Sequence, residues 1–349
     1  MKDIISRILK YRTPIIISTV VITSALVSII IIVNLPSGGG PYEGTYQKPP
    51  QFDITDIPIN VTNDMIYEDM SSLFFSNDGY LYLVFRAYDG NNNEIYITNN
   101  TSGNWSQPIN ITSNSVEDSY PSLIQADHGN FYLAYFSYGD FGYSLFLKNN
   151  SLGYWGDGIE IAYWGTGYGC SLIQAENRDL YIAYSADDGG DDDISVINNT
   201  LGDWGIPIQI TSDSYQNRNP SLVQTNDGVL YIAFESLRSD TDIYLINNSG
   251  GYWNDIIMIT NSSGYQGDPS MVRDSDDILY ILYEGDTNVD NEIFLINSSL
   301  PAWENPFNIT ADSFNDYEVS LVYVSDNHLY MSYRSYDGED WEIFVRRVM

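Results

Sequence analysis

Short runs of Ile, Val, Leu, Tyr and Phe alternate with polar turns along the whole chain after residue 50. One example is the run VLYIAFE, which follows the turn Asn226-Asp227-Gly228 and ends at a second polar turn. Such runs, separated by Asn-Gly or Asp-Gly type turns, are typical of β-hairpins. No stretch in this region keeps the apolar period of 3.6 residues that an amphipathic helix requires. The pattern therefore predicts an all-β domain.

The same pattern repeats six times at a step of 49 or 50 residues. Each copy contains four short strand signals, a serine followed by Leu or Met, and a tyrosine ten residues after that serine. A tryptophan closes five of the copies. Four antiparallel strands per repeat of this length are typical of a β-propeller blade. The marker serines are Ser72, Ser122, Ser171, Ser221, Ser270 and Ser320.

The motif of the fourth strand predicts how the ring closes. It reads PINIT or a close variant in five copies, and a sixth version, PINVT from Pro58, stands before the first marker serine. The last copy stops after its third strand, at Met349. We therefore expect the N-terminal motif to complete the last blade, which removes an open sheet edge. Residues 53–349 are predicted to form a six-bladed β-propeller of four-stranded antiparallel blades.

The N-terminal region has the pattern of a membrane anchor. Residues 15–33 carry no charge and include thirteen Ile, Val or Leu residues. As a helix they would span about 28 Å, close to the roughly 30 Å hydrocarbon core of a bilayer. The basic residues before them should stay in the cytoplasm. A cleaved signal peptide is the alternative, but the apolar run is longer than its usual core and no small-residue cleavage site follows.

These features predict the order of the chain and its location. We expect a cytoplasmic tail at 1–13, a transmembrane signal-anchor helix at 14–34 and a flexible Gly/Pro linker at 35–52. The protein would then be a single-pass protein of the cell membrane, with its N-terminus in the cytoplasm and its propeller outside the cell.

The composition limits the kinds of partner that the protein can bind. The formal net charge is −33, which excludes a nucleic-acid-binding role for practical purposes. The one cysteine, Cys170, is expected to be a small buried residue, so the domain has no disulfide. Glycosylation sequons recur at one place in the repeat, at the start of the third turn. The candidate asparagines are Asn99, Asn149, Asn198, Asn247 and Asn297.

The order of motifs in each copy resembles that of the sialidase-like, or BNR-repeat, six-bladed propellers. In that family an Asp box, roughly Ser-x-Asp-x-Gly-x-Thr-Trp, lies between the third and fourth strands. Copies here such as INNTLGDW keep the polar turn and the Trp but have Asn in place of Asp. The resemblance covers nearly all of the chain after residue 52 and implies the fold, whereas fold alone does not assign function.

The resemblance also implies where chemistry would lie. The turns between second and third strands and the connections between blades should meet at one mouth of the central channel. Sialidases place there three arginines, a tyrosine nucleophile with a glutamate base, and an aspartate acid. The matching residue types at this mouth are Arg86, Arg218, Arg334, Glu235, Glu284 and Tyr317. The alternative is that these residues form ion pairs between blades.

Two classes of function remain. We favour a membrane-anchored surface module that binds a glycan or a protein through aromatic and acidic loops. The alternative is a sialidase-type glycoside hydrolase that acts on acidic sugars, but the family's Arg-Ile-Pro motif is absent and the surface is acidic. No cofactor is expected apart from calcium, for which one acidic loop offers oxygen ligands without the spacing of an EF-hand. The candidate calcium ligands are Asp187, Asp188, Asp191 and Asp192.

Overall fold

The computed structural model describes residues 58–62, 67–140, 142–187, 189–299, 303–324, 328–336, 338 and 340–349. Regular structure within these residues is β-strand, apart from one short 3-10 helix, η1 (Ser249–Gly251). The predicted cytoplasmic tail, membrane helix and linker lie outside the described residues. Within the described part of the chain, no helix is both long and apolar enough to cross a bilayer.

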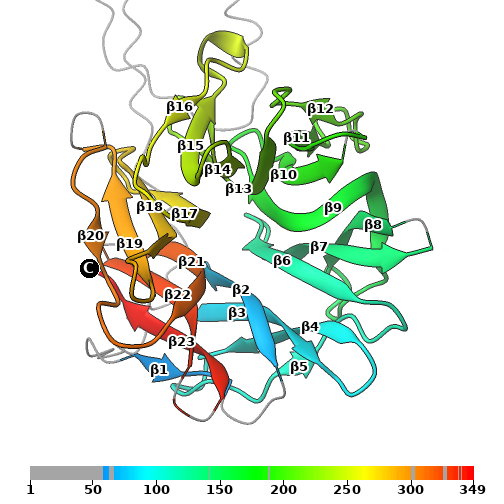
Figure 1. Cartoon of the computed structure of the whole chain (residues 1–349). Coiled ribbons are helices and arrows are strands. Elements are labelled where there is room, and N and C mark those ends of the chain that lie inside the picture. Colours follow the sequence, from blue (N-terminus) through cyan, green and yellow to red (C-terminus); the bar gives the residue numbers. More distant parts are fainter. Residues whose placement is uncertain are drawn as a thin grey trace, which may run out of the picture. The chain divides into compact units, whose positions relative to one another are not determined.

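The strands form a β-propeller in which antiparallel sheets follow one another around a centre (Figure 1). Four of the sheets are four-stranded blades, and in each the first strand of the repeat lies next to the centre. One blade contains β2 (Glu68–Phe75), β3 (Leu81–Tyr88), β4 (Asn93–Asn99) and β5 (Ile109–Asn110). Another contains β13 (Gln216–Gln224), β14 (Leu230–Leu237), β15 (Thr241–Asn247) and β16 (Ile257–Met258). The next contains β17 (Gln266–Arg273), β18 (Leu279–Asp286), β19 (Asn291–Asn297) and β20 (Phe307–Asn308).

The fourth of these blades joins the two ends of the described chain. It contains β21 (Asp316–Val324), β22 (His328–Tyr336), β23 (Trp341–Arg347) and β1 (Ile59–Asn60). The register places Ile59 of β1 opposite Val345 of β23. Beyond β1, the Thr62 hydroxyl donates to Glu342 Oε2 at 2.7 Å and accepts the backbone N–H of Ile343 at 3.0 Å. The PINVT motif therefore supplies the outer strand of the last sheet.

The remaining strands form one seven-stranded sheet, so the prediction of six separate blades is wrong in this respect. A single strand, β9, is shared, because its first part pairs with β8 and its second part with β10. The strands of this sheet are β6 (Asp118–Gln125), β7 (Phe131–Gly139), β8 (Gly142–Asn149), β9 (Ile159–Gln174), β10 (Leu180–Asp187), β11 (Asp192–Asn198) and β12 (Ile208–Gln209).

The local sequence explains why β9 is continuous. In the other copies the fourth-strand motif ends in Thr, and Ser, Asn or Asp, residues that favour a turn, follow within two positions. In β9 the corresponding segment, residues 162–168, reads AYWGTGY, which has no Asn, Asp or Ser and contains three aromatic residues. Aromatic residues favour extended backbone. The chain therefore stays extended from one repeat into the next.

The threonine of the fourth-strand motif has the same role in five repeats. Its hydroxyl donates to the acidic residue at the start of the third strand and accepts the backbone N–H of the following isoleucine. A buried carboxylate therefore obtains a hydrogen-bond partner at each of these positions, as buried charge requires. Besides the pair Thr62 and Glu342, the pairs are Thr112–Glu94, Thr211–Asp193, Thr260–Asp242 and Thr310–Glu292.

The asparagines of the repeated sequon stabilise the turn after the third strand. In each copy the side-chain oxygen accepts the backbone N–H of the residue two positions later, which forms an Asx turn. The tryptophan that follows packs against the buried apolar clusters. The recurrence of this motif therefore has a structural cause, and glycan attachment at these asparagines stays a prediction.

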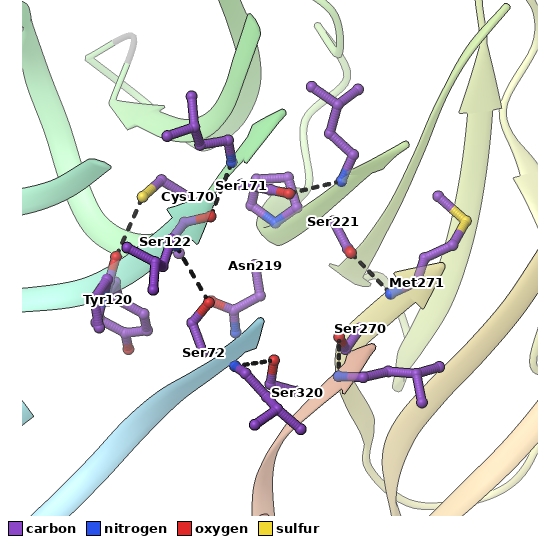
Figure 2. Close-up of a pocket in the computed structure, with 18 of the residues that line it drawn as sticks. Ser72, Tyr120, Ser122, Cys170, Ser171, Asn219, Ser221, Ser270, Met271 and Ser320 are labelled. Carbon is purple, nitrogen blue, oxygen red and sulfur yellow. Dashed lines mark hydrogen bonds between the residues drawn. The ribbon is translucent and has the colours of Figure 1, made fainter. Parts of the chain in front are cut away.

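The marker serines link the repeats around the centre (Figure 2). Each serine hydroxyl accepts the backbone N–H of the residue that follows the marker serine in the next repeat, at 2.8–3.4 Å. The bond from Leu73 to Ser320, at 2.9 Å, joins the first repeat to the last. These six hydrogen bonds form a closed ring, which explains why serine recurs at this position.

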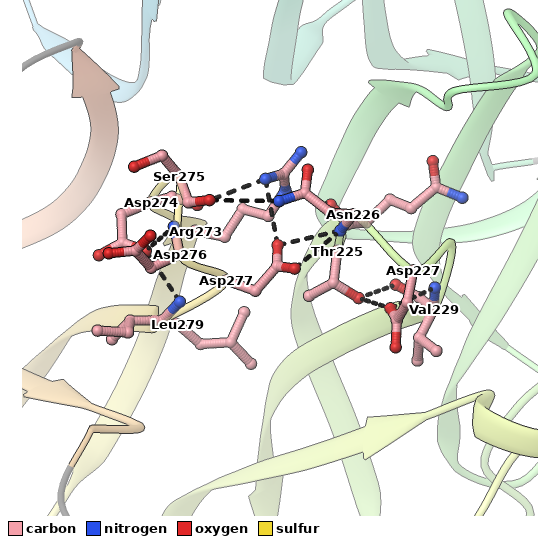
Figure 3. Close-up of polar contacts among 12 residues, drawn as sticks. Thr225, Asn226, Asp227, Val229, Arg273, Asp274, Ser275, Asp276, Asp277 and Leu279 are labelled. Carbon is pink, nitrogen blue, oxygen red and sulfur yellow. Dashed lines mark hydrogen bonds and ion pairs between the residues drawn. The ribbon is translucent and has the colours of Figure 1, made fainter. Parts of the chain in front are cut away.

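Other contacts link neighbouring repeats at the far ends of the first strands (Figure 3). The Asp277 carboxylate accepts the backbone N–H of Asn226 at 3.0 and 3.1 Å and pairs with Arg273 at 3.2 Å. Arg273 also donates to the backbone carbonyl of Gln224 at 2.6 Å. The turn between β13 and β14 is thereby held against the turn between β17 and β18.

Buried acidic residues lie where neighbouring repeats meet, near the start of the first strands. Glu68, Asp118 and Asp316 occupy the same position of the repeat and are 0% exposed. Burial raises the pKa of Glu68 to about 8, with the nearby charge of Glu342 as the next cause. Burial likewise raises the pKa of Asp118 to about 6 and that of Asp316 to about 7. At neutral pH the folded protein therefore holds protons that the unfolded chain would release.

We expect the protein to lose stability as the pH rises from about 5 to about 8. An unfolded Glu titrates near pH 4.3, so the unfolding free energy falls once the pH exceeds that value, until folded Glu68 is ionised. The substitution Glu68→Gln places there the residue that Gln266 supplies in another repeat. It should raise Tm by about 3–6 °C at pH 8.5 and change it little at pH 5. Thermal unfolding monitored by circular dichroism at both pH values tests this, and an equal effect at both would contradict it.

Candidate functional site

The first strands bulge at one position in every repeat, two residues before the marker serine. The φ angle of this residue lies between 47° and 72° in all six repeats. Only one of the six is glycine, although residues with a side chain rarely adopt this conformation. Bulges and left-handed residues of this kind redirect side chains and are common next to functional sites. The six residues are Met70, Tyr120, Gly169, Asn219, Asp268 and Glu318, and all of them line the central cavity.

The central cavity has a volume of about 330 Å³ and is lined by the first strands of all six repeats. The six bulge residues lie at the end where these strands begin, and the marker serines lie in the middle. Apolar side chains line the other end. A polar ligand would therefore find its hydrogen-bonding groups at the first end only. The apolar residues are Phe74, Ile124, Ile173, Val223, Val272 and Val322.

Four carboxyl groups gather at the polar end. Glu235 lies near the end of β14 and Glu284 near the end of β18, and both side chains are buried. Asp268 of β17 and Glu318 of β21 are bulge residues and are partly exposed. The Glu284 carboxylate accepts the backbone N–H of Glu318, and the Glu318 carboxylate accepts the N–H of Met70 at 2.7 Å. Backbone groups of the bulges thus hold the acids in place.

The environment keeps part of this carboxyl cluster protonated. Burial raises the pKa of Glu284 to about 8 and that of Glu318 to about 7. Burial and then the charge of Glu284 raise the pKa of Asp268 well above its ordinary value. Asp268 and Glu284 are hydrogen-bonded to each other, which requires a proton on one of the two groups. The site can therefore both donate and accept hydrogen bonds near neutral pH.

A tyrosine–glutamate pair adjoins this cluster. The Tyr265 hydroxyl donates to Glu235 Oε2 at 2.9 Å, and the backbone N–H of Asp268 donates to the same oxygen at 3.0 Å. Burial is the main cause that raises the pKa of Tyr265, so its phenol keeps the proton that it donates. Gly267 makes this pairing possible, because a Cβ atom there would overlap the Tyr265 hydroxyl and the Glu235 carboxylate.

The three predicted arginines are engaged by acidic residues of the protein. Arg86 forms a two-pronged ion pair with Asp69, in which Nε lies 2.6 Å from Oδ1. Arg218 forms an ion pair with Asp192. The Arg218 guanidinium also stacks at 4.0 Å on the ring of Tyr168. These two arginines are therefore largely neutralised before any ligand arrives.

The third arginine, Arg334, has weaker contacts. Its ion pair with Glu318 is 3.9 Å long, and its Nε has no partner among the described residues. Its guanidinium lies over the ring of Trp341, with the carbon atom Cζ 4.8 Å from the ring centroid. The Tyr317 ring also packs on Trp341, with centroids 5.5 Å apart. Tyr317 is the tyrosine among the candidate residues from the sequence, and its ring contacts an indole, whereas the tyrosine bonded to a carboxylate is Tyr265.

The sequence and the structure agree on part of the site. The structure brings Glu235 and Glu284 together with Asp268, and it places Arg86 and Arg334 within electrostatic range of Glu318. Sequence reasoning missed Asp69, Tyr265 and Asn219. Asp69 could have been found, because it lies opposite Arg86 in the antiparallel register. Tyr265 lies in a connection between blades, where no repeat position marks it.

The predicted calcium loop has other partners in the structure. The Asp192 carboxylate pairs with Arg218, and the Asp187 carboxylate accepts the backbone N–H of Gly189 at 2.7 Å. Asp188 lies outside the described residues. Among the residues that the structure describes, no group of three His, Cys, Asp or Glu side chains could hold a metal ion.

Exposed tyrosines occur on the face of the propeller at which the polar end of the cavity lies. They lie at the starts of first strands, at the ends of second strands and in the connections between repeats. Their exposed fractions range from 38% to 65%, so the rings offer flat apolar surface to a ligand. These residues are Tyr67, Tyr88, Tyr138, Tyr168 and Tyr215.

Solved structures with a similar fold include sialidases and an arabinanase. A protein of unknown function from Dyadobacter fermentans is 12% identical, with a TM-score of 0.66 over 83% of this chain and 98% of that chain. A leech intramolecular trans-sialidase is 11% identical, with a TM-score of 0.63 over 84% of this chain and 70% of that chain. An α-L-arabinanase from Penicillium chrysogenum, complexed with arabinobiose, is 15% identical, with a TM-score of 0.65 over 83% and 98%.

These likenesses confirm the predicted resemblance to the sialidase-like propellers at the level of the fold. The identities are too low to carry more than the fold. No protein-family model matches the sequence, and no curated protein matches it.

Proposed function

We propose that the protein binds a neutral glycan at the polar end of its central cavity. The observation that carries the proposal is the carboxyl cluster of Glu235, Asp268, Glu284 and Glu318, which keeps protons near neutral pH and lies on a face of the propeller that also exposes tyrosines. Carboxyl groups form hydrogen bonds with sugar hydroxyls, and aromatic rings pack against the apolar faces of sugars. The sialidases and the arabinanase that share the fold are named for acting on carbohydrates, which agrees with this class of ligand.

The electrostatics favour a neutral sugar over an acidic one. A carboxylated sugar needs free cationic groups, whereas Arg86 and Arg218 are already paired with Asp69 and Asp192. The net charge of −33 would also repel an anion on approach. The acidic-sugar specificity of a sialidase is therefore the weaker interpretation.

A glycan array tests the proposal directly. The full chain, solubilised in mild detergent, should bind neutral glycans at neutral pH. A Glu284→Ala/Asp268→Ala double variant should lose most of that binding, because it removes both the donor and the acceptor groups of this pair. Binding that is confined to sialylated glycans would favour the sialidase interpretation, and no binding to any glycan would reject the proposal.

A second candidate function is glycoside hydrolysis. The hydrogen bond of 2.9 Å between Tyr265 and Glu235 favours it, since a glutamate can take the proton of a tyrosine nucleophile. Asp268 carries a raised pKa beside this pair and is placed to act as the acid. Release of aryl alcohol from neutral aryl glycosides, abolished by Tyr265→Phe, would establish this activity.

We further propose that each of the six repeats corresponds to one propeller blade, with two blades fused through β9. The six serine hydrogen bonds and the shared strand support this count. The six copies of the repeat in the sequence and the ring of six bulge residues agree with this count.

We also propose that residues 15–33 anchor the protein in the membrane and that the propeller lies outside the cell. Protease added to intact cells should digest the propeller and leave the N-terminal tail protected. A chain that is protected throughout its length would reject this orientation.

A further inference from the structure

A second hollow lies in the turns beside β21, β22 and β23. Its volume is about 360 Å³, and we call it the aromatic pocket, defined by its lining residues Ser313, Phe314, Asn315, Tyr336 and Trp341. Phe314 and Tyr336 expose 41% and 36% of their surface. Tyr336 and Trp341 meet edge to face, with ring centroids 5.6 Å apart. The pocket therefore combines three aromatic rings with two small polar side chains.

The aromatic pocket adjoins the carboxyl cluster. Its Trp341 ring lies under the guanidinium of Arg334 at 4.8 Å, and Arg334 pairs with Glu318 at 3.9 Å. Glu318 in turn lines the central cavity. Arg334 thus connects the two hollows, and a ligand longer than one sugar ring could occupy both.

The lining residues favour a sugar ring as the occupant. Aromatic rings pack against the apolar C–H face of a sugar. The Ser313 hydroxyl and the Asn315 amide can form hydrogen bonds with the hydroxyl groups of the sugar. The side-chain oxygen of Asn315 accepts the backbone N–H of Asn291 at 2.9 Å, so the side-chain NH₂ group of Asn315 is the donor that a ligand could use. An organic cation would also suit three aromatic rings. However, Arg334 already places a positive charge on Trp341, which disfavours a second one.

We propose that the aromatic pocket is an outer subsite, which holds a further ring of a neutral oligosaccharide whose first ring is bound at the carboxyl cluster. This inference rests on the proposed function and specifies its ligand as an oligosaccharide chain. Affinity should therefore grow with chain length.

The test measures binding of the full chain to neutral pentose and hexose oligosaccharides in series from one to five rings. For the parent protein we expect affinity to rise about tenfold from the shortest bound member to the longer ones. Phe314→Ala and Trp341→Ala should reduce that gain to less than about threefold, and Trp341→Phe should retain most of it. Phe314→Ala is the cleaner variant, because Trp341 also supports Arg334. Tyr252→Ala, at an exposed tyrosine outside both hollows, is the matched control.

Each outcome is decisive. A length-dependent gain that is lost only in the pocket variants supports the inference. Equal gain in the parent and the pocket variants rejects the outer subsite while leaving the proposed function intact. Absence of binding to every sugar by the parent rejects the proposed function and this inference with it. Displacement of a bound sugar by tetramethylammonium would show that the pocket selects cations, which also overturns the inference.

Discussion

Replacing Thr62 by valine should destabilise the propeller by about 2 kcal/mol or more, whereas Thr62→Ser should cost much less. Valine keeps the shape of threonine but removes the hydroxyl, which donates to Glu342 at 2.7 Å and accepts the N–H of Ile343 at 3.0 Å. Each buried polar group that loses its partner costs about 1–3 kcal/mol, and more when it is charged. Serine keeps both hydrogen bonds.

The position of Thr62 makes this loss larger than at the equivalent threonines. Its partner Glu342 lies 280 residues away in the chain, whereas Thr112 and its partner Glu94 are 18 residues apart. Loosening Thr62 also loosens β1, which joins the two ends of the described chain through its ladder with β23. Thermal unfolding should show a drop in Tm of about 5 °C or more for Thr62→Val and a smaller drop for Thr112→Val. Equal values for the two variants would contradict a special role for the closing strand.

Gly267→Ala should abolish glycan binding without unfolding the protein. The added methyl group would overlap the Tyr265 hydroxyl and the Glu235 carboxylate, which must then separate. The backbone of Gly267 is not left-handed, so alanine itself is not strained there. The displaced atoms, which include the ring carbon Cζ of Tyr265, belong to side chains and not to the backbone, so the Tyr265 ring and the Glu235 carboxylate must move while the sheet persists.

A matched control is available in the chain. Gly205→Ala places its methyl 3.5 Å from the nearest heavy atom, the backbone oxygen of Asn198, which is an ordinary contact. Binding to neutral glycans should fall at least about tenfold in Gly267→Ala and stay unchanged in Gly205→Ala. Tm should stay close to the parent value in both variants. Normal binding by a folded Gly267→Ala variant would show that the Tyr265–Glu235 pair does not belong to the binding site.

The features of this fold that could be predicted are those that recur in the sequence. The marker serines, the Thr of the fourth-strand motif and the Asn of the third turn each make the same contact in successive repeats. Repetition reveals such residues, because one contact must be satisfied many times. The exception, β9, also has a local cause, since its segment AYWGTGY lacks the turn residues that the other copies contain.

The site was harder to predict because it depends on what differs between repeats. Arg218 is paired with Asp192 of the preceding repeat, a contact set by the acidic loop rather than by strand register. The Tyr265–Glu235 pair joins residues 30 positions apart and needs the missing side chain of Gly267. Tyr317 has the residue type that the resemblance implies for the site, but its ring packs against Trp341. The residue types at the mouth of the central channel could therefore be predicted from the sequence, but the residues that they contact could not.

The serine hydrogen bonds all run in one direction around the centre, with the donor always in the repeat after the acceptor except where Leu73 returns to Ser320. Contacts of this head-to-tail kind, when made between separate molecules, produce either closed rings or endless filaments. Here both partners of every contact belong to one polypeptide, and the bond from Leu73 to Ser320 uses the donor and the acceptor that an open array would leave for another molecule. Ring closure within the chain thus protects a repetitive protein against polymerisation.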